Sequence, residues 1–362
     1  MQILHLVPTG KWAGTEVIAS GLANYQCRKH RVGVALATSS RFSPSFYRPK
    51  FRPDVDLFFI PENVKGAAEQ AAWLTRQMPW RPNVMHAHLG PGCRIARALT
   101  NWPAVRIASM HIRFYRVHFE GMDAVVGISP WQLRDVPTTF DGRAYQVTNF
   151  LTPPPKSKPE NVAWFRRSVH ADEETFVIGS IGRLQVEKGM DLLIRAYHRA
   201  QLDNARLVII GDGEQRPRLE RLAAGDPTIL LRGFVDQANS LIPGMDVYVS
   251  SARGEPFGLT LLEAMGYGRP IIATATLGAS DIFGDRPDVL VPMDDVDALA
   301  DALRAKAEAR ESTVRYDLTP FDYEARNGDM LRIYEELVRD VLPGKRAHSG
   351  SSVWRPPQRP LT

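Results

Sequence analysis

Residues 255–270 constrain this 362-residue chain more than any other stretch. The apolar run 245–249 leads into small polar residues and then into this segment, an order that predicts a buried strand, a loop and a helix. Pro256 suits the beginning of that helix, and Gly268 before Pro270 marks its end. The N-terminus of a helix carries unpaired N–H groups and a partial positive charge of about half a unit, so it attracts phosphate or sugar oxygens.

Two glutamates flank this predicted anion site. Glu255 lies in the loop ahead of the first turn, and Glu263 lies on the helix between one and two turns further in. Carboxylates on both sides of an anion site can accept hydrogen bonds from hydroxyl groups. The arrangement therefore suits a ligand with both phosphate and hydroxyl groups, such as a nucleotide sugar.

Strand and helix signals alternate along both halves of the chain, which predicts an α/β fold with two doubly wound parallel-sheet domains. The length also favours two domains over one. Hydrophobic residues make up 44% of the chain and charged residues 23%, as in ordinary globular proteins. Cys27 and Cys93 are too few for a disulfide framework, which favours a reducing compartment.

The first eight residues lack a basic leader and a long apolar core, so we interpret them as a first strand rather than a signal peptide. No apolar run approaches the roughly 20 residues that span a bilayer. The sequence thus predicts a cytoplasmic protein that can associate with the inner face of the membrane.

Charge is distributed unevenly. Through Phe150 the chain has 18 Lys and Arg against 9 Asp and Glu, a net +9; from Leu151 onward it has 27 against 31, a net −4. The basic half indicates an anionic partner such as a membrane surface, a lipid diphosphate or a nucleic acid. The alternative is a set of scattered, solvated arginines.

Residues 41–53 interleave four cations with four aromatic rings, and their prolines exclude a long regular helix. Such a loop could rest on a membrane or bind a glycan or lipid-linked acceptor. Equally, its aromatic rings could pack into the domain. The candidate acceptor or membrane residues are Arg41, Phe46, Tyr47, Arg48, Lys50 and Arg52.

A second candidate anion site lies at 182–189, between a predicted strand at 176–181 and a predicted helix at 190–200. Arg183 and Lys188 are placed where two cations and free backbone amides can neutralise a diphosphate.

Three histidines lie on two predicted strands. His86 and His88 share one face of the strand 83–88, and His111 ends the strand 105–111, at the edge where α/β sheets bind ligands. A metal site needs further ligands nearby, and no acidic residue or cysteine has suitable spacing, so we expect no metal site.

The segments 255–270 and 182–189 together resemble the donor-site signature of GT4-type retaining glycosyltransferases (glycosyl transferases group 1), which have the GT-B fold of two Rossmann-like domains facing across a cleft. The resemblance implies that Glu255 contacts the donor sugar, that Glu263 contacts the nucleotide ribose, and that Arg183 and Lys188 bind the pyrophosphate. It assigns catalytic roles to Glu255, His111, Arg183 and Lys188.

The loop after the first strand also resembles this family, whose G-G-x-E motif matches at Gly14 and Glu16 but has Ala13 in place of the first glycine. The resemblance extends donor binding to the remaining motif positions, which are Gly182, Gly211, Gly233, Phe234, Phe257, Gly258 and Leu259.

The domains expected from these signals are an acceptor-binding domain at 1–150, a proline-rich linker at 151–160, a nucleotide-sugar-binding domain at 161–322, a C-terminal helix at 323–342 that returns to the first domain, and a flexible tail at 343–362.

The predicted reaction moves a sugar from a nucleotide diphosphate sugar to an acceptor hydroxyl with retention, without a metal or other cofactor, in the synthesis of a cell-surface polysaccharide, lipopolysaccharide or glycolipid. A GT-B nucleotide-sugar epimerase and a non-enzymatic binder of nucleotides or other anions remain as alternatives. We expect no nucleic acid partner, because the sequence contains no nucleic-acid-binding motif.

Overall fold

The computed structural model describes residues 1–152, 159–284, 286 and 288–348. The chain divides into two compact units. Unit 1 contains Met1–Phe150 and resumes at Tyr323, whereas unit 2 contains Leu151–Asp322. Most of the linker expected at 151–160 lies outside the described residues.

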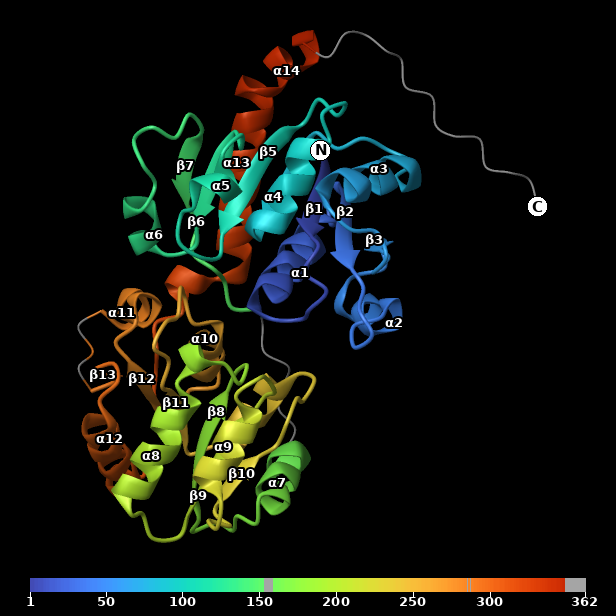
Figure 1. Cartoon of the computed structure of the whole chain (residues 1–362). Helices are drawn as coiled ribbons and strands as arrows, with labels where there is room; N and C mark the ends of the chain where they lie inside the picture. The colour runs from blue at the N-terminus through green and yellow to red at the C-terminus, as the bar shows by residue number, and fades with distance from the viewer. Residues whose placement is uncertain (153–158, 285, 287, 349–362) are drawn as a thin grey trace. The chain divides into compact units, whose positions relative to one another are not determined.

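Unit 1 is built on a parallel sheet of seven strands among the residues described (Figure 1). In spatial order the strands are β3 (Val55–Ile60), β2 (Arg31–Ala37), β1 (Gln2–Val7), β4 (Val84–His88), β5 (Val105–Met110), β6 (Ala124–Gly127) and β7 (Arg143–Gln146). The direction of the winding reverses between β1 and β4.

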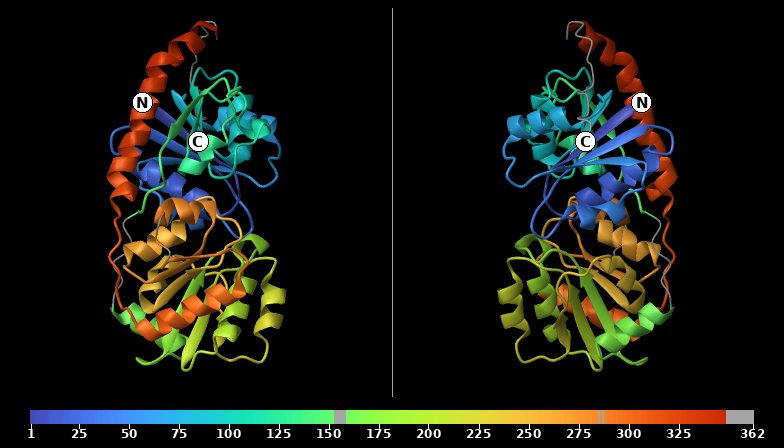
Figure 2. Two further views of the ribbon diagram at one scale, coloured as in Figure 1. Left: turned by 90° about the vertical axis from the view of Figure 1, so that its left-hand side faces the viewer. Right: turned by 90° about the vertical axis from the view of Figure 1, so that its right-hand side faces the viewer.

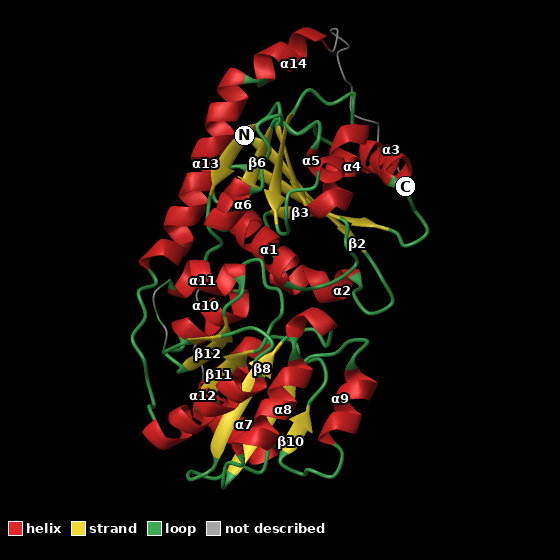
Figure 3. Cartoon of the chain, turned by 60° about the vertical axis from the view of Figure 1, so that its left-hand side comes forward, coloured by secondary structure: helices red, strands yellow, loops and turns green. Residues whose placement is uncertain are grey.

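Helices cover both faces of this sheet (Figure 3). The helical segments are α1 (Gly14–Gln26), α2 (Pro44–Tyr47), η1 (Arg48–Lys50), α3 (Ala67–Gln77), α4 (Leu89–Ala98), α5 (Arg116–Phe119), α6 (Pro130–Arg134), α13 (Tyr323–Asp340) and α14 (Leu342–His348). Alternation along the strands sends Leu4 and Leu6 into the apolar core with α3 and α4, whereas His5 points to the opposite face.

Helix α13 is part of unit 1 and runs along one face of its sheet (Figure 2). It packs against α1, and the Tyr323 hydroxyl donates a 2.8 Å hydrogen bond to the carbonyl oxygen of Gly21. At the other end of the helix, Glu336 accepts a 2.7 Å hydrogen bond from Arg143. Both ends of α13 are thereby fixed to the first half of the chain.

The flexible tail was expected to begin at residue 343, and this boundary is wrong. Residues 343–348 belong to α14, and the Lys345 ammonium lies 2.6 Å from a carboxylate oxygen of Asp123. Composition suggested a mobile segment, but a tertiary ion pair holds this turn. Residues 349–362 of the expected tail lie outside the described residues.

Unit 2 is built on a second parallel sheet, of six strands among the residues described. Its order is β10 (Ile229–Leu231), β9 (Ala205–Ile210), β8 (Phe176–Ile181), β11 (Val247–Ser250), β12 (Ile271–Thr274) and β13 (Leu290–Val291). The winding reverses between β8 and β11, so both units have the doubly wound α/β architecture that the sequence predicts.

The helical segments of unit 2 are α7 (Pro159–Ser168), η2 (Val186–Lys188), α8 (Met190–Ala200), α9 (Arg216–Ala223), η3 (Ala238–Gly244), α10 (Leu259–Gly266), α11 (Leu277–Phe283), α12 (Val296–Ala309) and η4 (Thr319–Phe321). Helices α8, α9 and α12 share one apolar core with the sheet. In the described part of the chain, no helix is long and apolar enough to cross a bilayer.

We predict that Leu337→Ala destabilises unit 1, because Leu337 on α13 is fully buried. Removing a buried leucine side chain costs about 2–5 kcal/mol. The matched control is Glu335→Ala on the exposed side of the same helix, with an expected change within about 0.5 kcal/mol. Urea unfolding followed by tryptophan fluorescence measures both. Equal stability of the two variants would show that α13 is not an integral part of the unit.

Candidate active site

The candidate site in unit 2 is formed by the loops that follow β8 and β11. These strands are neighbours at the point where the winding of the sheet reverses, and α/β sheets bind ligands at the carboxyl edge of such a pair. The first loop contains residues 182–189, one of the two segments singled out from the sequence, and the second, 251–258, contains the beginning of the other.

A close backbone contact joins the two loops. Gly189 has a φ of 59°, and a Cβ atom there would lie 1.9 Å from the carbonyl oxygen of Ser251. The Ser251 hydroxyl in turn donates a 2.8 Å hydrogen bond to the Gly189 carbonyl oxygen. Only glycine fits this position, since it tolerates the left-handed backbone and leaves room for the second loop.

An arginine that the sequence analysis did not single out strengthens this junction. Arg253 donates hydrogen bonds of 2.7 and 3.1 Å to the Asp191 carboxylate and one of 3.1 Å to the carbonyl oxygen of Val186. Burial alone would raise the pKa of Asp191, but the Arg253 guanidinium outweighs burial and lowers it. The only sequence signal for this pair was its position. Arg253 lies two residues from Glu255, and Asp191 lies two residues from Gly189.

The structure brings two predicted site residues together across the junction. The Lys188 ammonium bonds to the Glu255 carboxylate, although the residues are 67 positions apart. Their side chains are 25% and 15% exposed. The pair is thus partly shielded from water but still open to a ligand.

Arg183 has a different environment. It is exposed and directly follows Gly182 after the end of β8. Its guanidinium has no hydrogen bond or ion pair with any described residue. Its charge is therefore available to an anionic ligand.

The helix after Glu255 begins later than predicted. Pro256 was expected near its beginning, but α10 begins at Leu259, because Gly258 adopts a left-handed φ of 106° immediately before it. Phe257 lies in the preceding loop, where it is buried with its ring edge toward Phe321. Its side chain supports the loop from inside the unit.

Glu263 lies on α10 in a buried environment. It accepts a 3.1 Å hydrogen bond from the amide nitrogen of Asn239 in η3, a partner without a sequence signal. Burial raises the pKa of the Glu263 carboxyl from 4.5 to about 7. The group can therefore change its protonation state near neutral pH.

The remaining predicted residues of unit 2 lie after β9 and β10. The Gly211 amide donates a 2.8 Å hydrogen bond to the carbonyl oxygen of Gly233. The next residue, Phe234, is 39% exposed. This places an accessible aromatic ring at the carboxyl edge of the same sheet.

In unit 1, the predicted loop residues stabilise their own loop. Gly14 is the first residue of α1. The buried Glu16 carboxylate accepts a 2.8 Å hydrogen bond from the Ala13 amide and another from the Thr9 hydroxyl. Through these hydrogen bonds, Glu16 links the loop after β1 to the first turn of α1.

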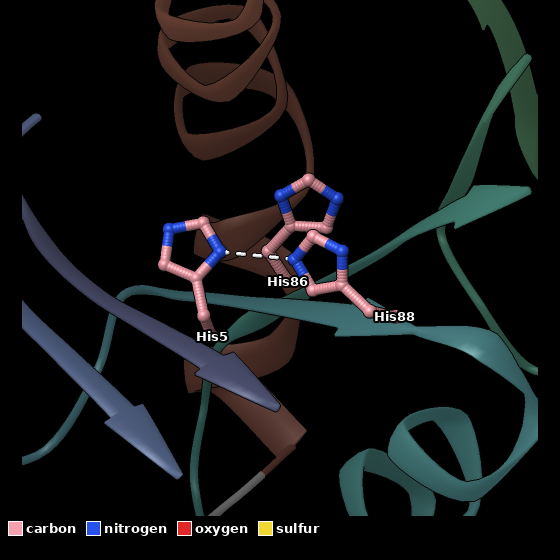
Figure 4. A group of neighbouring side chains, drawn as sticks. All are labelled: His5, His86 and His88. Carbon is pink, nitrogen blue, oxygen red and sulfur yellow. Dashed lines mark hydrogen bonds between the residues drawn. The ribbon is translucent and has the colours of Figure 1, made fainter. Parts of the chain in front are cut away.

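His111 belongs to a buried histidine cluster on one face of the first sheet. His86 and His88 were expected to share a face, and the structure adds His5 from β1, which pairs in register with His86 (Figure 4). One ring nitrogen from each of these three side chains lies within 4.8 Å of the others. The sequence argument against a metal site considered only neighbouring residues, and it missed the third histidine because β1 is remote in sequence.

The aromatic rings of residues 41–53 pack against unit 1, which is the second of the two alternatives left open by the sequence. Tyr47 is fully buried, and its hydroxyl donates a 3.1 Å hydrogen bond to the Lys11 carbonyl oxygen. Phe46 packs against Trp12, while Lys50 lies 4.5 Å from the Phe46 ring centroid. The exposed cations of this segment are Arg41, Arg48 and Arg52.

Part of unit 2 matches a known protein family. Residues 175–308 match the family described as "Glycosyl transferases group 1". An uncharacterized glycosyltransferase of Methanocaldococcus jannaschii is 35% identical over 34% of this chain and 34% of its own length. The lipopolysaccharide core biosynthesis glycosyltransferase LpsE of Rhizobium meliloti is 30% identical over 39% of this chain and 42% of its own. The matches thus span about a third to two fifths of these relatives.

A solved structure extends the comparison to the whole fold. HepE of Anabaena, crystallised with UDP and glucose, covers 93% of this chain and 100% of its own, with a TM-score of 0.78 and 19% identity. The chain accordingly has the GT-B fold, and residues 175–308 match the family that the motifs resemble.

We predict that Glu263 makes the stability of unit 2 depend on pH. The unfolded carboxyl loses its proton near pH 4.5 and the folded one near pH 7, so the free energy of unfolding falls as the pH rises between these values. The shift corresponds to roughly 3 kcal/mol. Glu263→Gln should remove this loss. From pH 4 to above pH 7, the free energy of unfolding of the variant should therefore rise by about that amount relative to that of the parent. Chemical unfolding at both pH values measures the difference, and parallel pH profiles would contradict the prediction.

Proposed function

We propose that this protein is a retaining glycosyltransferase that moves a sugar from a nucleotide diphosphate sugar to an acceptor hydroxyl. The observation that carries this proposal is the contact between Lys188 and Glu255, which joins a phosphate-binding cation and a sugar-binding carboxylate at the reversal point of the sheet. In this proposal unit 2 binds the donor.

The donor diphosphate is recognised by charge. Arg183 has no anionic partner within the described chain, and α10 begins directly after the left-handed turn at Gly258. The first amides of a helix have no intrahelical partner and can donate to a phosphate. When the bond to the sugar breaks, negative charge accumulates on the departing diphosphate. Arg183, Lys188 and these amides stabilise that charge electrostatically.

The two glutamates bind hydroxyl groups on either side of the diphosphate. Glu255 orients the donor sugar, and its contact with Lys188 keeps the carboxylate next to the phosphate-binding cation. Glu263 accepts a hydrogen bond from the nucleotide ribose. Its contact with Asn239 holds the carboxyl group in place before the ligand arrives.

Retention requires that the acceptor attack from the side of the sugar on which the diphosphate leaves. The departing diphosphate accepts the proton of the acceptor hydroxyl, so no separate protein base is needed. The two cations supply the charge that a metal ion supplies in other transferases, and the proposed reaction therefore needs no metal or other cofactor.

The acceptor is a glycan or a lipid-linked sugar bound by unit 1, in the synthesis of a cell-surface polysaccharide, lipopolysaccharide or glycolipid. The basic charge of residues 1–150 supports an anionic acceptor or contact with the inner face of an anionic membrane in the cytoplasm. Similarity to LpsE supports this class of acceptor. Because the aromatic rings of 41–53 are packed inside, Arg41, Arg48 and Arg52 are the remaining candidates in that segment.

The first experiment measures thermal stabilisation by nucleoside diphosphates and nucleotide sugars. A ligand that binds only the folded state adds about 2.7 kcal/mol at about a hundred times its dissociation constant. We expect stabilisation by one family of bases in the parent protein and its loss in Arg183→Ala. The matched control is Arg195→Ala, because Arg195 is an exposed arginine on the adjacent helix α8. Equal stabilisation of Arg183→Ala and the control would contradict the proposed phosphate role.

A second experiment measures turnover once a donor is known. Lys188→Met and Glu255→Gln should each lower the rate of sugar transfer by about a hundredfold to a thousandfold, as expected when one electrostatic stabiliser is removed. Both variants should retain the circular dichroism spectrum and melting behaviour of a folded protein. Normal turnover in either folded variant would refute the site assignment, and donor binding without any transfer would favour a binding protein.

A further inference from the structure

The histidine cluster in unit 1 forms a continuous hydrogen-bonded chain that ends at His111. The carboxamide oxygen of Gln26 lies 2.8 Å from Nε2 of His5, and Nδ1 of His5 lies 3.1 Å from Nε2 of His88. Nδ1 of His88 then lies 3.0 Å from Nε2 of His111. Each ring contacts the next through a different nitrogen, so a proton on one ring fixes the proton on the next.

Such a chain has two self-consistent directions. A neutral imidazole has one N–H donor and one acceptor nitrogen. If His5 donates to Gln26, then His88 donates to His5 and His111 donates to His88. If the Gln26 amide is reversed, every donor in the chain becomes an acceptor. The orientation of Gln26 therefore decides which nitrogen of His111 carries the proton.

The neighbouring Tyr334 decides this orientation. Its hydroxyl lies between Nδ1 of His86 and the amide nitrogen of Gln26, which donates to it at 3.4 Å. Since the Tyr334 oxygen accepts from Gln26, its own proton goes to Nδ1 of His86. Burial raises the pKa of Tyr334, which keeps this proton in place. Gln26 thereby faces Tyr334 with its NH₂ group and Nε2 of His5 with its oxygen.

We propose that Gln26, His5 and His88 are positioning residues that hold His111 in the Nε2–H tautomer, so that His111 presents a bare Nδ1 as a hydrogen-bond acceptor directly after the carboxyl end of β5. His111 keeps 9% of its surface exposed, whereas His5, His86 and His88 are fully buried. No described residue hydrogen-bonds to Nδ1 of His111.

The same contacts disfavour use of the cluster as a metal site. Both ring nitrogens of His5 and of His88 are in the chain, and those of His86 face Tyr334 and the Ser109 hydroxyl, the latter at 2.8 Å. A metal ion needs bare nitrogen lone pairs, so ligation would break these hydrogen bonds. Burial also lowers the pKa of His5 and His111 to about 4, which keeps both rings neutral near pH 7.

The test is two-bond ¹H–¹⁵N correlation NMR of the full chain labelled with [¹⁵N]histidine, at pH 7 and without ligand. Protonated and bare ring nitrogens resonate in separate ranges, so the spectrum reports each tautomer directly. Assignment uses the signal lost in His111→Asn. We expect a pure Nε2–H tautomer for His111 in the parent protein. A predominant Nδ1–H tautomer would overturn the proposal.

His5→Leu interrupts the chain. His88 then loses its acceptor, and a buried N–H without a partner is costly, so His88 should shift its proton to Nδ1 and donate to His111. We expect His111 to gain an Nδ1–H population. In His5→Asn, the side-chain oxygen takes the place of the acceptor nitrogen and should restore the Nε2–H tautomer. The matched control, Ser109→Ala, removes a buried hydrogen bond of the His86 branch alone and should leave His111 unchanged.

An unchanged His111 tautomer in folded His5→Leu would refute the relay, as would stoichiometric zinc in the purified protein by elemental analysis. If His5→Leu does not fold, the parent spectrum and His5→Asn still decide the matter. These measurements need neither donor nor acceptor, so a failed relay is distinguishable from a failed glycosyltransferase assignment.

Discussion

The contact between the backbone at Gly189 and the Ser251 carbonyl is the constraint on which the candidate site of unit 2 depends. Two loops that follow neighbouring strands can share a ligand only if their backbones approach each other, and a side chain at Gly189 would prevent that approach. Arg253 then links the same loops through Asp191 and Val186. With the backbones held in this way, the Lys188 ammonium and the Glu255 carboxylate lie in contact.

The two units use buried polar groups in different ways. In unit 2, Glu263 has a single amide partner, and burial leaves its carboxyl with a pKa near neutrality. In unit 1, the histidines satisfy one another, with Gln26, Tyr334 and Ser109 at the edges of the network. A buried polar network is stable only when nearly all of its donors and acceptors are paired. That requirement makes the direction of its hydrogen bonds a property of the whole cluster rather than of any one histidine.

The sequence predicted much of the fold because its signals are local. Helix α8 has the bounds that the sequence predicts, 190–200, and the parallel sheets follow from alternating strand and helix signals. The errors have tertiary causes. The left-handed turn at Gly258 delays the beginning of α10, and an ion pair between Lys345 and Asp123 orders the beginning of the expected tail. The sequence also left open whether the rings of residues 41–53 pack inward, and the core of unit 1 decides that they do. The roles of the site residues themselves stay predictions.

By itself, the sequence determined which loops carry charge and glycine, and where along the chain they follow a strand, because these properties depend on residues close together. Only the tertiary structure decided which side chains meet. Lys188 reaches Glu255 across 67 positions, Asn239 reaches Glu263 from a segment without a motif, and His5 joins His86 because β1 and β4 pair in that register. Such contacts are set by sheet order and strand register, which depend on how the whole core packs and leave no local pattern in the sequence.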